Sequence, residues 1–470
     1  MLVATRGLGT SDFGLVNLIV IYTTFLNYFL TFGFDNSLVY YIAQFNSQKK
    51  FHLKKDIFKL SIFLTGGVGL LFILASCIIA YFVLDGTSNK NTLLVTVLVI
   101  FQCYFWSLGG IFSALLRGNK NFGPSILREQ FVFPVAQLLL FIVFIRFYNF
   151  GSVGYALGYF LASFLSFIFV AYVVFKKRHV FFDNKPIQPQ VSTLNNQKKW
   201  FKFSFPLSLM SSIEPALMWS SVALCGYFLL NVDVAKFTVF SRLSILTQLL
   251  FVALGPIVSS YMASMYHEKK TDNFDKLYKL TVSWSSKWAI LLGFLLISTS
   301  DYILKIFGKD YSLDSFTLLF LLPGFIFEGS LGIGKHALIM SGYNKINIIN
   351  MATAVIINIL LGLVLIPYFG ITGAAMALSL AMILLNIIRV IQVYYFIRVT
   401  PFSLKNFVKL FSMCILFLTT GAAIRYGNLA GDIRISLSVT IFSVTLILSF
   451  WKDSKTFFNM ISSRLLGQKN

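Results

Sequence analysis

Seven ionisable residues lie well inside long apolar runs of this 470-residue chain, where charge is unfavourable, and five of them are candidate functional groups. The cations are Arg242 and Lys335, and the carboxylates are Asp35, Glu214 and Glu328. A guanidinium can bind a phosphate through two parallel hydrogen bonds, so we interpret Arg242 and Lys335 as candidate residues for an anionic ligand. A carboxylate in such a place can take up a proton or a sodium ion, so the three acidic residues are candidates for ion coupling.

Each of these residues also has an ordinary structural interpretation. Arg242 lies about 10 Å from the outer end of its expected helix, so it could extend to the outer surface or pair with a carboxylate. Glu328 and Lys335 share a helix face, but about 10.5 Å separates them along the axis, which is too far for a direct pair. Glu328 and Glu214 could equally be partners of an arginine or lysine on another helix. These alternatives stay open at the level of sequence.

Other polar features of the apolar runs favour no site. Lys287 and Arg389 lie within about three turns of one membrane surface, and we expect them to extend to it. Residues 329–335 read GSLGIGK, most of a phosphate-binding loop, but His336 follows instead of Ser or Thr, which favours a glycine-rich membrane helix. His267 has no second histidine at metal-binding spacing. The cysteines have no metal-ligand or redox spacing either: Cys77, Cys103, Cys225 and Cys414. We therefore expect no metal and no cofactor.

Composition indicates which elements must position these residues. The chain is 57% hydrophobic and 12% charged, with a mean hydropathy of +0.79, whereas soluble proteins carry about 25% charged residues. Runs of about 20 apolar residues predict membrane-spanning helices, and we count about thirteen. They cover 14–45, 57–84, 92–116, 125–147, 151–175, 201–230, 235–262, 280–304, 315–341, 346–367, 371–397, 404–426 and 433–451. The prediction is an all-α polytopic membrane protein.

The basic residues orient these helices. The net charge is +22, but the charges stand in short tracts between apolar runs, which indicates membrane topology rather than nucleic-acid binding. If connections alternate between the two sides, 27 of the 39 lysines and arginines fall on one side, so this side and the C-terminus are predicted to be cytoplasmic. Residues 1–6 resemble the tail of a helix, so we expect about one further helix before them.

Three pairs of short segments recur at nearly one spacing. FGSVGYA at 150–156 returns as FGITGAA at 369–375, an offset of 219 residues, and weaker echoes link 9–15 with 231–237 and 117–120 with 341–345. A period of six helices predicts two parallel repeats related by a pseudo-two-fold axis along the membrane normal. We expect an N-terminal lobe at 1–175, a cytoplasmic linker at 176–200, a C-terminal lobe at 201–397 and two additional helices with a tail at 398–470.

The same segments resemble polysaccharide flippases of the Wzx type, in the multidrug/oligosaccharidyl-lipid/polysaccharide (MOP) exporter superfamily. The resemblance is carried by RGLG at 6–9 with FGL at 13–15, GFDNSLV at 33–39 with YIA at 41–43, GYFL at 226–229 and FGxxGxA at 369–375. It implies fourteen helices in two six-helix lobes plus two C-terminal helices. The family pattern often has Arg where this chain has Tyr40, and an Asp-Arg pair where it has Ser221 and Val222, so no cargo-binding residue is carried over.

The resemblance implies a non-enzymatic transporter in the cell inner membrane that moves undecaprenyl-diphosphate-linked oligosaccharide for surface polysaccharides such as the O-antigen of lipopolysaccharide. Its partners would be this lipid-linked cargo, membrane lipid, and glycosyltransferases and a polymerase of the same pathway, with no nucleic acid. Two alternatives stay open: an ion-coupled antiporter of drugs or organic cations from the same superfamily, and a membrane polysaccharide polymerase. The excess of embedded cations favours an anionic cargo.

Overall fold

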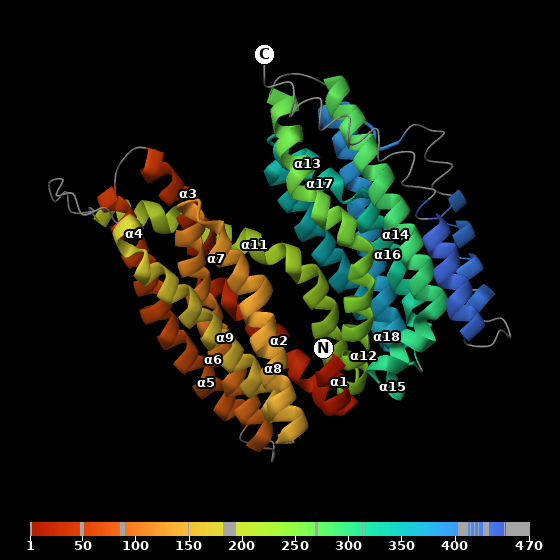
Figure 1. The fold of residues 1–470 in the computed structure, drawn as a ribbon, viewed down its shortest axis with the longest axis horizontal. Helices are drawn as coiled ribbons and strands as arrows, with labels where there is room; N and C mark the ends of the chain where they lie inside the picture. The colour runs from red at the N-terminus through yellow and green to blue at the C-terminus, as the bar shows by residue number, and fades with distance from the viewer. Residues whose placement is uncertain are drawn as a thin grey trace. The chain divides into compact units, whose positions relative to one another are not determined.

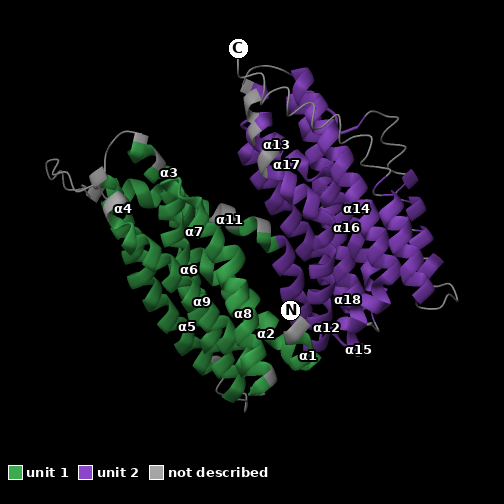
Figure 2. Cartoon of the chain, in the orientation of Figure 1, with its two compact units in different colours: residues 1–216 green, residues 217–470 purple. Residues whose placement is uncertain are grey.

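The computed structural model describes most of the chain. The described residues are 2–47, 51–84, 90–148, 150–181, 194–267, 271–312, 314, 316–402, 412–413, 415–417, 419–421, 423–425, 432–445 and 447. Every regular element among them is helical, and Figure 1 shows them as long rods. The chain divides into two compact units, Met1–Ala216 and Leu217–Asn470 (Figure 2).

Unit 1 is built around α6, which packs against α9, α3, α2 and α5. Its helices are α1 (Leu2–Gly7), α2 (Thr10–Leu30), α3 (Phe34–Ser47), α4 (Phe51–Ile62), α5 (Gly69–Leu84), α6 (Lys90–Gly118), α7 (Phe122–Leu127), α8 (Phe133–Phe141), α9 (Gly151–Lys176) and α10 (Arg178–Phe181). Three π-helical segments interrupt the spans: η1 (Phe63–Val68), η2 (Arg128–Val132) and η3 (Ile142–Phe147). Such segments inside α-helices are frequent at functional sites, and η2 places a charged residue in the interior of this unit.

Unit 2 has α16 at its centre, packed between α14 and α18. Its helices are α12 (Asn231–Ser244), the 3₁₀ segment η4 (Ile245–Gln248), α13 (Leu249–His267), α14 (Thr271–Phe307), α15 (Lys309–Ser312), α16 (Thr317–Leu331), α17 (Ile333–Met340) and α18 (Asn344–Ile397). α11 (Leu194–Phe228) crosses the boundary between the units and contains Pro206 and Pro215. Its first half bonds to α3 through Ser204 and Ser37, whose hydroxyl oxygens are 2.5 Å apart.

The recurring glycine turn has the same backbone conformation in both units. Gly151 and Gly370 have φ of 54° and 57°, the left-handed region that glycine enters without strain. A side chain on Gly154 would meet the carbonyl oxygen of Phe144 at 3.0 Å, and one on Gly373 would meet that of Leu365 at 2.2 Å. The break at Gly370 also divides α18, whose 54 residues would otherwise be about 80 Å long and far exceed a bilayer. The two spans predicted on either side of this turn are confirmed.

The apolar helices match the predicted spans across most of the chain. Nine helices among the described residues are long and apolar enough to cross a membrane, and α18 counts once although it holds two predicted spans. The predicted span at 201–230 is not among these nine: it belongs to α11, which begins at Leu194, and only Pro215–Phe228 forms a continuous apolar helix there. The spans predicted at 404–426 and 433–451 and the linker at 176–200 lie partly outside the described residues. The chain is therefore an all-α multi-pass membrane protein.

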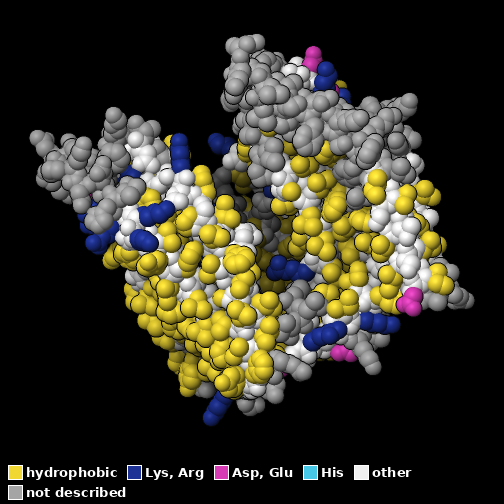
Figure 3. Space-filling view, in the orientation of Figure 1, with side chains coloured by type: hydrophobic (Ala, Val, Ile, Leu, Met, Phe, Trp, Pro, Cys, Tyr) yellow, Lys and Arg dark blue, Asp and Glu magenta, His cyan; other side chains and the backbone are white. Residues whose placement is uncertain are grey.

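Exposed side chains show where lipid lies against the helices. Large apolar residues with more than half of their surface exposed follow η1 and α5, among them Phe63, Leu71, Ile79 and Phe82. Figure 3 shows hydrophobic side chains over most of the outer face of each unit, with Lys and Arg side chains mainly near the helix ends. A surface of this size cannot face water and indicates the hydrocarbon of a membrane.

Candidate functional site

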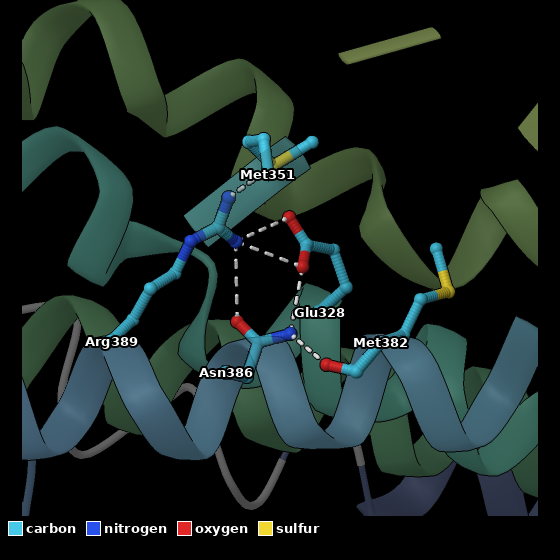
Figure 4. A network of polar contacts seen from close by, with 5 residues as sticks. All are labelled: Glu328, Met351, Met382, Asn386 and Arg389. Carbon is cyan, nitrogen blue, oxygen red and sulfur yellow. Dashed lines mark hydrogen bonds and ion pairs between the residues drawn. The ribbon is translucent and has the colours of Figure 1, made fainter. Parts of the chain in front are cut away.

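A charged network lies in the interior of unit 2, where α16 meets α18 (Figure 4). Nη1 of Arg389 lies 3.2 Å from Oε1 and 3.1 Å from Oε2 of Glu328. The amide of Asn386 donates to Oε2 at 2.7 Å, and its oxygen lies 3.5 Å from Nη1 of Arg389. Nη2 of Arg389 lies 2.9 Å from the sulfur of Met351. The packing of α16 on α18 thus brings together a carboxylate and a guanidinium that are 61 positions apart in the chain.

Burial differs between the partners of this network. The Arg389 side chain is 1% exposed, whereas 14% of the Glu328 side chain remains accessible. The charge of Arg389 is satisfied mainly by this carboxylate, because its other contacts are a thioether and an amide. The expectation that Arg389 extends to the membrane surface is wrong, since tertiary packing places its whole side chain beside Glu328. The alternative that Glu328 pairs with a cation on another helix is confirmed.

Lys335 lies one helical segment beyond Glu328, on α17, and is partly buried. Seven residues separate it from Glu328, about 10.5 Å along a helix axis, a distance over which two charges interact appreciably in a low-dielectric interior. Residues 329–335 are helical apart from a turn at Gly332, as predicted for a glycine-rich membrane helix. His336 points to α13, where Nδ1 lies 2.8 Å from the hydroxyl of Ser259.

Arg242 occupies a different environment, in the last turn of α12. Its side chain is exposed, although its helix belongs to an apolar span at Asn231–Gly255, and it makes no ion pair with another described residue. Its neighbours Ser241 and Ser244 are buried and bond to their own helix backbone. An exposed guanidinium on an apolar span can bind an anion without first breaking an existing pair.

Asp35 stands in the first turn of α3, in the interior of unit 1. Its Oδ1 atom is buried and has no hydrogen-bond partner among the described residues, and the charge of Arg117 on α6 acts on it. Glu214 lies on α11 beside Pro215, but its side chain is outside the part that the structure describes. Asp35 thus belongs to unit 1, whereas Arg242 and Glu328 belong to α12 and α16 of unit 2.

Arg128 is one of the 27 basic residues that the sequence analysis placed in the cytoplasmic connections, and its burial within a helical segment contradicts that placement. Its side chain is 1% exposed and lies in η2. It donates to the carbonyl oxygen of Trp106 at 3.0 Å and to the hydroxyl of Ser113 at 3.3 Å, and its guanidinium stacks on the Trp106 ring at 4.5 Å. Arg128 falls within the predicted span at 125–147, and that position was the signal for its burial.

One departure from the resemblance has a structural counterpart. The family pattern often has a charged pair where this chain has Ser221 and Val222; here Ser221 belongs to a neutral network. The buried amide of Asn358 donates to the hydroxyls of Ser221 and Ser220, both at 2.8 Å. Hydroxyls and an amide thus occupy this place without a net charge. Among the described residues, no group of histidine, cysteine or acidic side chains could hold a metal ion.

Two helical units with charges buried in their interiors are consistent with a multi-pass membrane transporter, and solved structures of the MOP superfamily share this fold. The structure is similar to a multidrug resistance MATE family transporter of that superfamily in an inward-facing conformation, with a TM-score of 0.72, 14% identity and coverage of 88% of this chain and 93% of the other. It is also similar to the lipid II flippase MurJ in an inward closed conformation, with a TM-score of 0.67, 17% identity and coverage of 96% and 97%. At such identities the likeness establishes the fold alone.

The sequence gives the family within this fold. The profile of the family described as "Polysaccharide biosynthesis protein" matches residues 1–262, more than half of the chain, so this chain belongs to that family. A relative from Haloferax volcanii, the "Probable low-salt glycan biosynthesis flippase Agl15", is 24% identical over 196 residues. That match spans 40% of this chain and 40% of the relative.

Proposed function

We propose that this protein translocates undecaprenyl-diphosphate-linked oligosaccharide units across the cytoplasmic membrane, for the synthesis of surface polysaccharides such as O-antigen. Membership of the polysaccharide biosynthesis protein family supports this proposal, and so does the similarity to a probable glycan biosynthesis flippase. Glycosyltransferases that build the cargo would act before this translocation step, and a polymerase that consumes the cargo would act after it.

The proposed mechanism is alternating access between two lobes of six helices. Hydrocarbon excludes both the phosphates and the sugar hydroxyls of the head group, so these groups need a wet, positively charged chamber. The lipid tail can remain in the membrane at a lateral opening. In this proposal the lobes are 1–175 and 201–397, related by a pseudo-two-fold axis along the membrane normal, with a linker at 176–200. Two further helices at 398–470 end in the cytoplasm.

The exposed guanidinium of Arg242 is the observation that carries the proposal. It lies on an apolar span and makes no ion pair with another described residue, as expected of a group that binds a mobile anion. We assign the diphosphate to Arg242 and Lys335. Asp35, Glu214 and Glu328 are the candidates for coupling translocation to protons or sodium ions.

Charge-removing substitutions test this assignment in cells. We expect Arg242→Gln and Lys335→Gln each to abolish surface polysaccharide and to accumulate cytoplasm-facing lipid-linked units, while the protein still inserts. Lys90→Gln is the matched control, because Lys90 is exposed at the first residue of α6, and we expect normal polysaccharide. Normal polysaccharide in both the Arg242 and the Lys335 variants would remove these residues from the site.

The shared fold also admits an antiporter of drugs or organic cations, the alternative raised by the sequence. A cationic cargo should meet carboxylates, yet the exposed ionisable group of the described α12 is the guanidinium of Arg242. A drug-susceptibility panel on a deletion strain separates the two functions. We expect unchanged susceptibility together with lost surface polysaccharide; increased susceptibility with normal polysaccharide would favour the antiporter.

A further inference from the structure

The glycine-rich run at 329–335 lies beside the charged network of unit 2, which is formed by Glu328, Asn386 and Arg389. A side chain on Gly332 would meet Oε1 of Glu328 at 3.2 Å and the Phe251 ring at 3.0 Å. One on Gly334 would meet the Tyr278 hydroxyl at 3.3 Å and Cβ of Arg389 at 3.6 Å. Gly332 therefore leaves room for the Glu328 carboxylate, and Gly334 leaves room for the Tyr278 hydroxyl, which gives the run a role other than phosphate binding.

The Glu328 carboxylate lies against the next turn of its own helix. Oε1 lies 3.2 Å from the place where a Cβ on Gly332 would stand, at the turn between α16 and α17, and Lys335 follows on α17. Arg389 approaches the same carboxylate from α18 and contacts both of its oxygens. Lys335 follows Glu328 by seven residues, so Arg389 and Lys335 both place positive charge near one carboxylate.

We propose that Arg389 is a positioning residue that binds the Glu328 carboxylate and so keeps its negative charge from cancelling the field of Lys335. This inference rests on the proposed function, because it explains how a site that includes an acid still selects an anionic cargo. Arg389 itself is too deeply buried to touch cargo, at 1% side-chain exposure. Its contribution is the electrostatic potential at residue 335, which sets the specificity of the site.

The net charge near residue 335 predicts how variants of Glu328 and Arg389 rank in their preference for an anion. Glu328 and Arg389 together contribute no net charge near residue 335, Arg389→Gln leaves one negative charge, and Glu328→Gln leaves one positive charge. The double variant Glu328→Gln/Arg389→Gln restores neutrality. Preference for an anion at residue 335 should therefore be highest in Glu328→Gln, equal in the parent and the double variant, and lowest in Arg389→Gln.

The potential can be measured without any translocation. Lys335→Cys is introduced into full-length protein in which the four native cysteines are replaced, and it is labelled with an anionic sulfonatoethyl or a cationic trimethylammonioethyl methanethiosulfonate. The ratio of the two labelling rates reports the local potential. Loss of Arg389 should lower the ratio of anionic to cationic labelling on the order of tenfold, because one unit charge acts oppositely on the two reagents.

Controls make each result decisive. Lys90→Cys in unit 1 should keep its ratio when Arg389 is replaced, and Arg389→Lys, which retains the charge, should keep the parent ratio at residue 335 even if Arg389→Gln folds poorly. Equal ratios in all the Lys335→Cys variants, or no labelling at residue 335, would overturn the inference and leave the proposed function intact. The expected order together with normal polysaccharide in Lys335→Gln would instead uphold the field of Arg389 and contradict the assignment of the cargo diphosphate to Lys335.

Discussion

Among the described residues, each unit has one arginine whose side chain is only 1% exposed, and the two are stabilised in different ways. Arg128 in unit 1 is held by neutral groups, namely the carbonyl and ring of Trp106 and the hydroxyl of Ser113. The nearest acid, Glu129, lies 3.6 Å away with 34% of its side chain exposed. Arg389 in unit 2 is bound by both oxygens of Glu328, whose side chain is 14% exposed.

The two arginines differ in the acidic charge that is left unpaired when each of them is replaced. Without Arg128, Glu129 can turn further towards solvent, so little uncompensated charge stays inside. Without Arg389, a carboxylate stays in the interior of a membrane span and must find another cation or a proton. Unit 1 thus uses its arginine for packing and hydrogen bonding, whereas unit 2 uses it to control the charge of an acid.

The largest expected effect is on the stability of unit 2. Arg389→Met should destabilise the protein by about 3–5 kcal/mol, because it leaves Glu328 buried and unpaired. Glu328→Gln/Arg389→Met should recover most of that loss, since both charges are then absent. Unfolding in a titration with denaturing detergent measures both variants, and a double variant no more stable than Arg389→Met would contradict the pairing.

Replacing the arginine of unit 1 should have a smaller effect. Arg128→Met removes a cation–π contact and two hydrogen bonds from a charged group, but it leaves no buried anion, so we expect a loss of about 1–3 kcal/mol. The same titration measures it. A loss as large as that of Arg389→Met, with no rescue by Glu129→Gln, would show that the two arginines are stabilised alike.

Two adjacent glycines of α6 test how closely Arg128 packs in unit 1. A Cβ on Gly109 would lie 2.5 Å from Nη2 of Arg128, whereas one on Gly110 would have nothing within 4 Å. Gly109→Ala should therefore cost about 1–3 kcal/mol through overpacking, and Gly110→Ala should be neutral or slightly stabilising. Equal unfolding midpoints for the two alanine variants would mean that Arg128 does not lie against Gly109.

A partly exposed ion pair of unit 2 should make the smallest contribution to the free energy of unfolding. Nζ of Lys279 lies 2.6 Å from Oδ2 of Asp275, one turn earlier on α14, and both side chains are about one-third exposed. Lys279→Ala should cost only about 0.3–0.5 kcal/mol, because water and salt screen such pairs. A loss comparable to that of Arg389→Met would contradict the ranking by burial.

Hydropathy was enough to predict the spans that the nine long apolar helices form, because lipid requires such helices whatever their tertiary contacts. The repeated glycine turn was likewise visible in the sequence, since Gly151 and Gly370 adopt a backbone conformation that few other residues tolerate. The π-helical segment that turns Arg128 inward has no comparable signal. The pairing of Glu328 with Arg389 joins residues 61 positions apart and follows from how α16 packs on α18, which periodicity does not specify.

Reconstitution tests the central claim most directly. Purified protein is placed in sealed vesicles that contain an undecaprenyl-diphosphate-linked oligosaccharide, and a membrane-impermeant glycosidase is added outside. We predict that the parent protein makes nearly all of the lipid-linked sugar accessible, whereas Arg242→Gln/Lys335→Gln leaves only the outer-leaflet fraction accessible, as in protein-free vesicles. Accessibility limited to the outer leaflet with the folded parent protein would contradict the account.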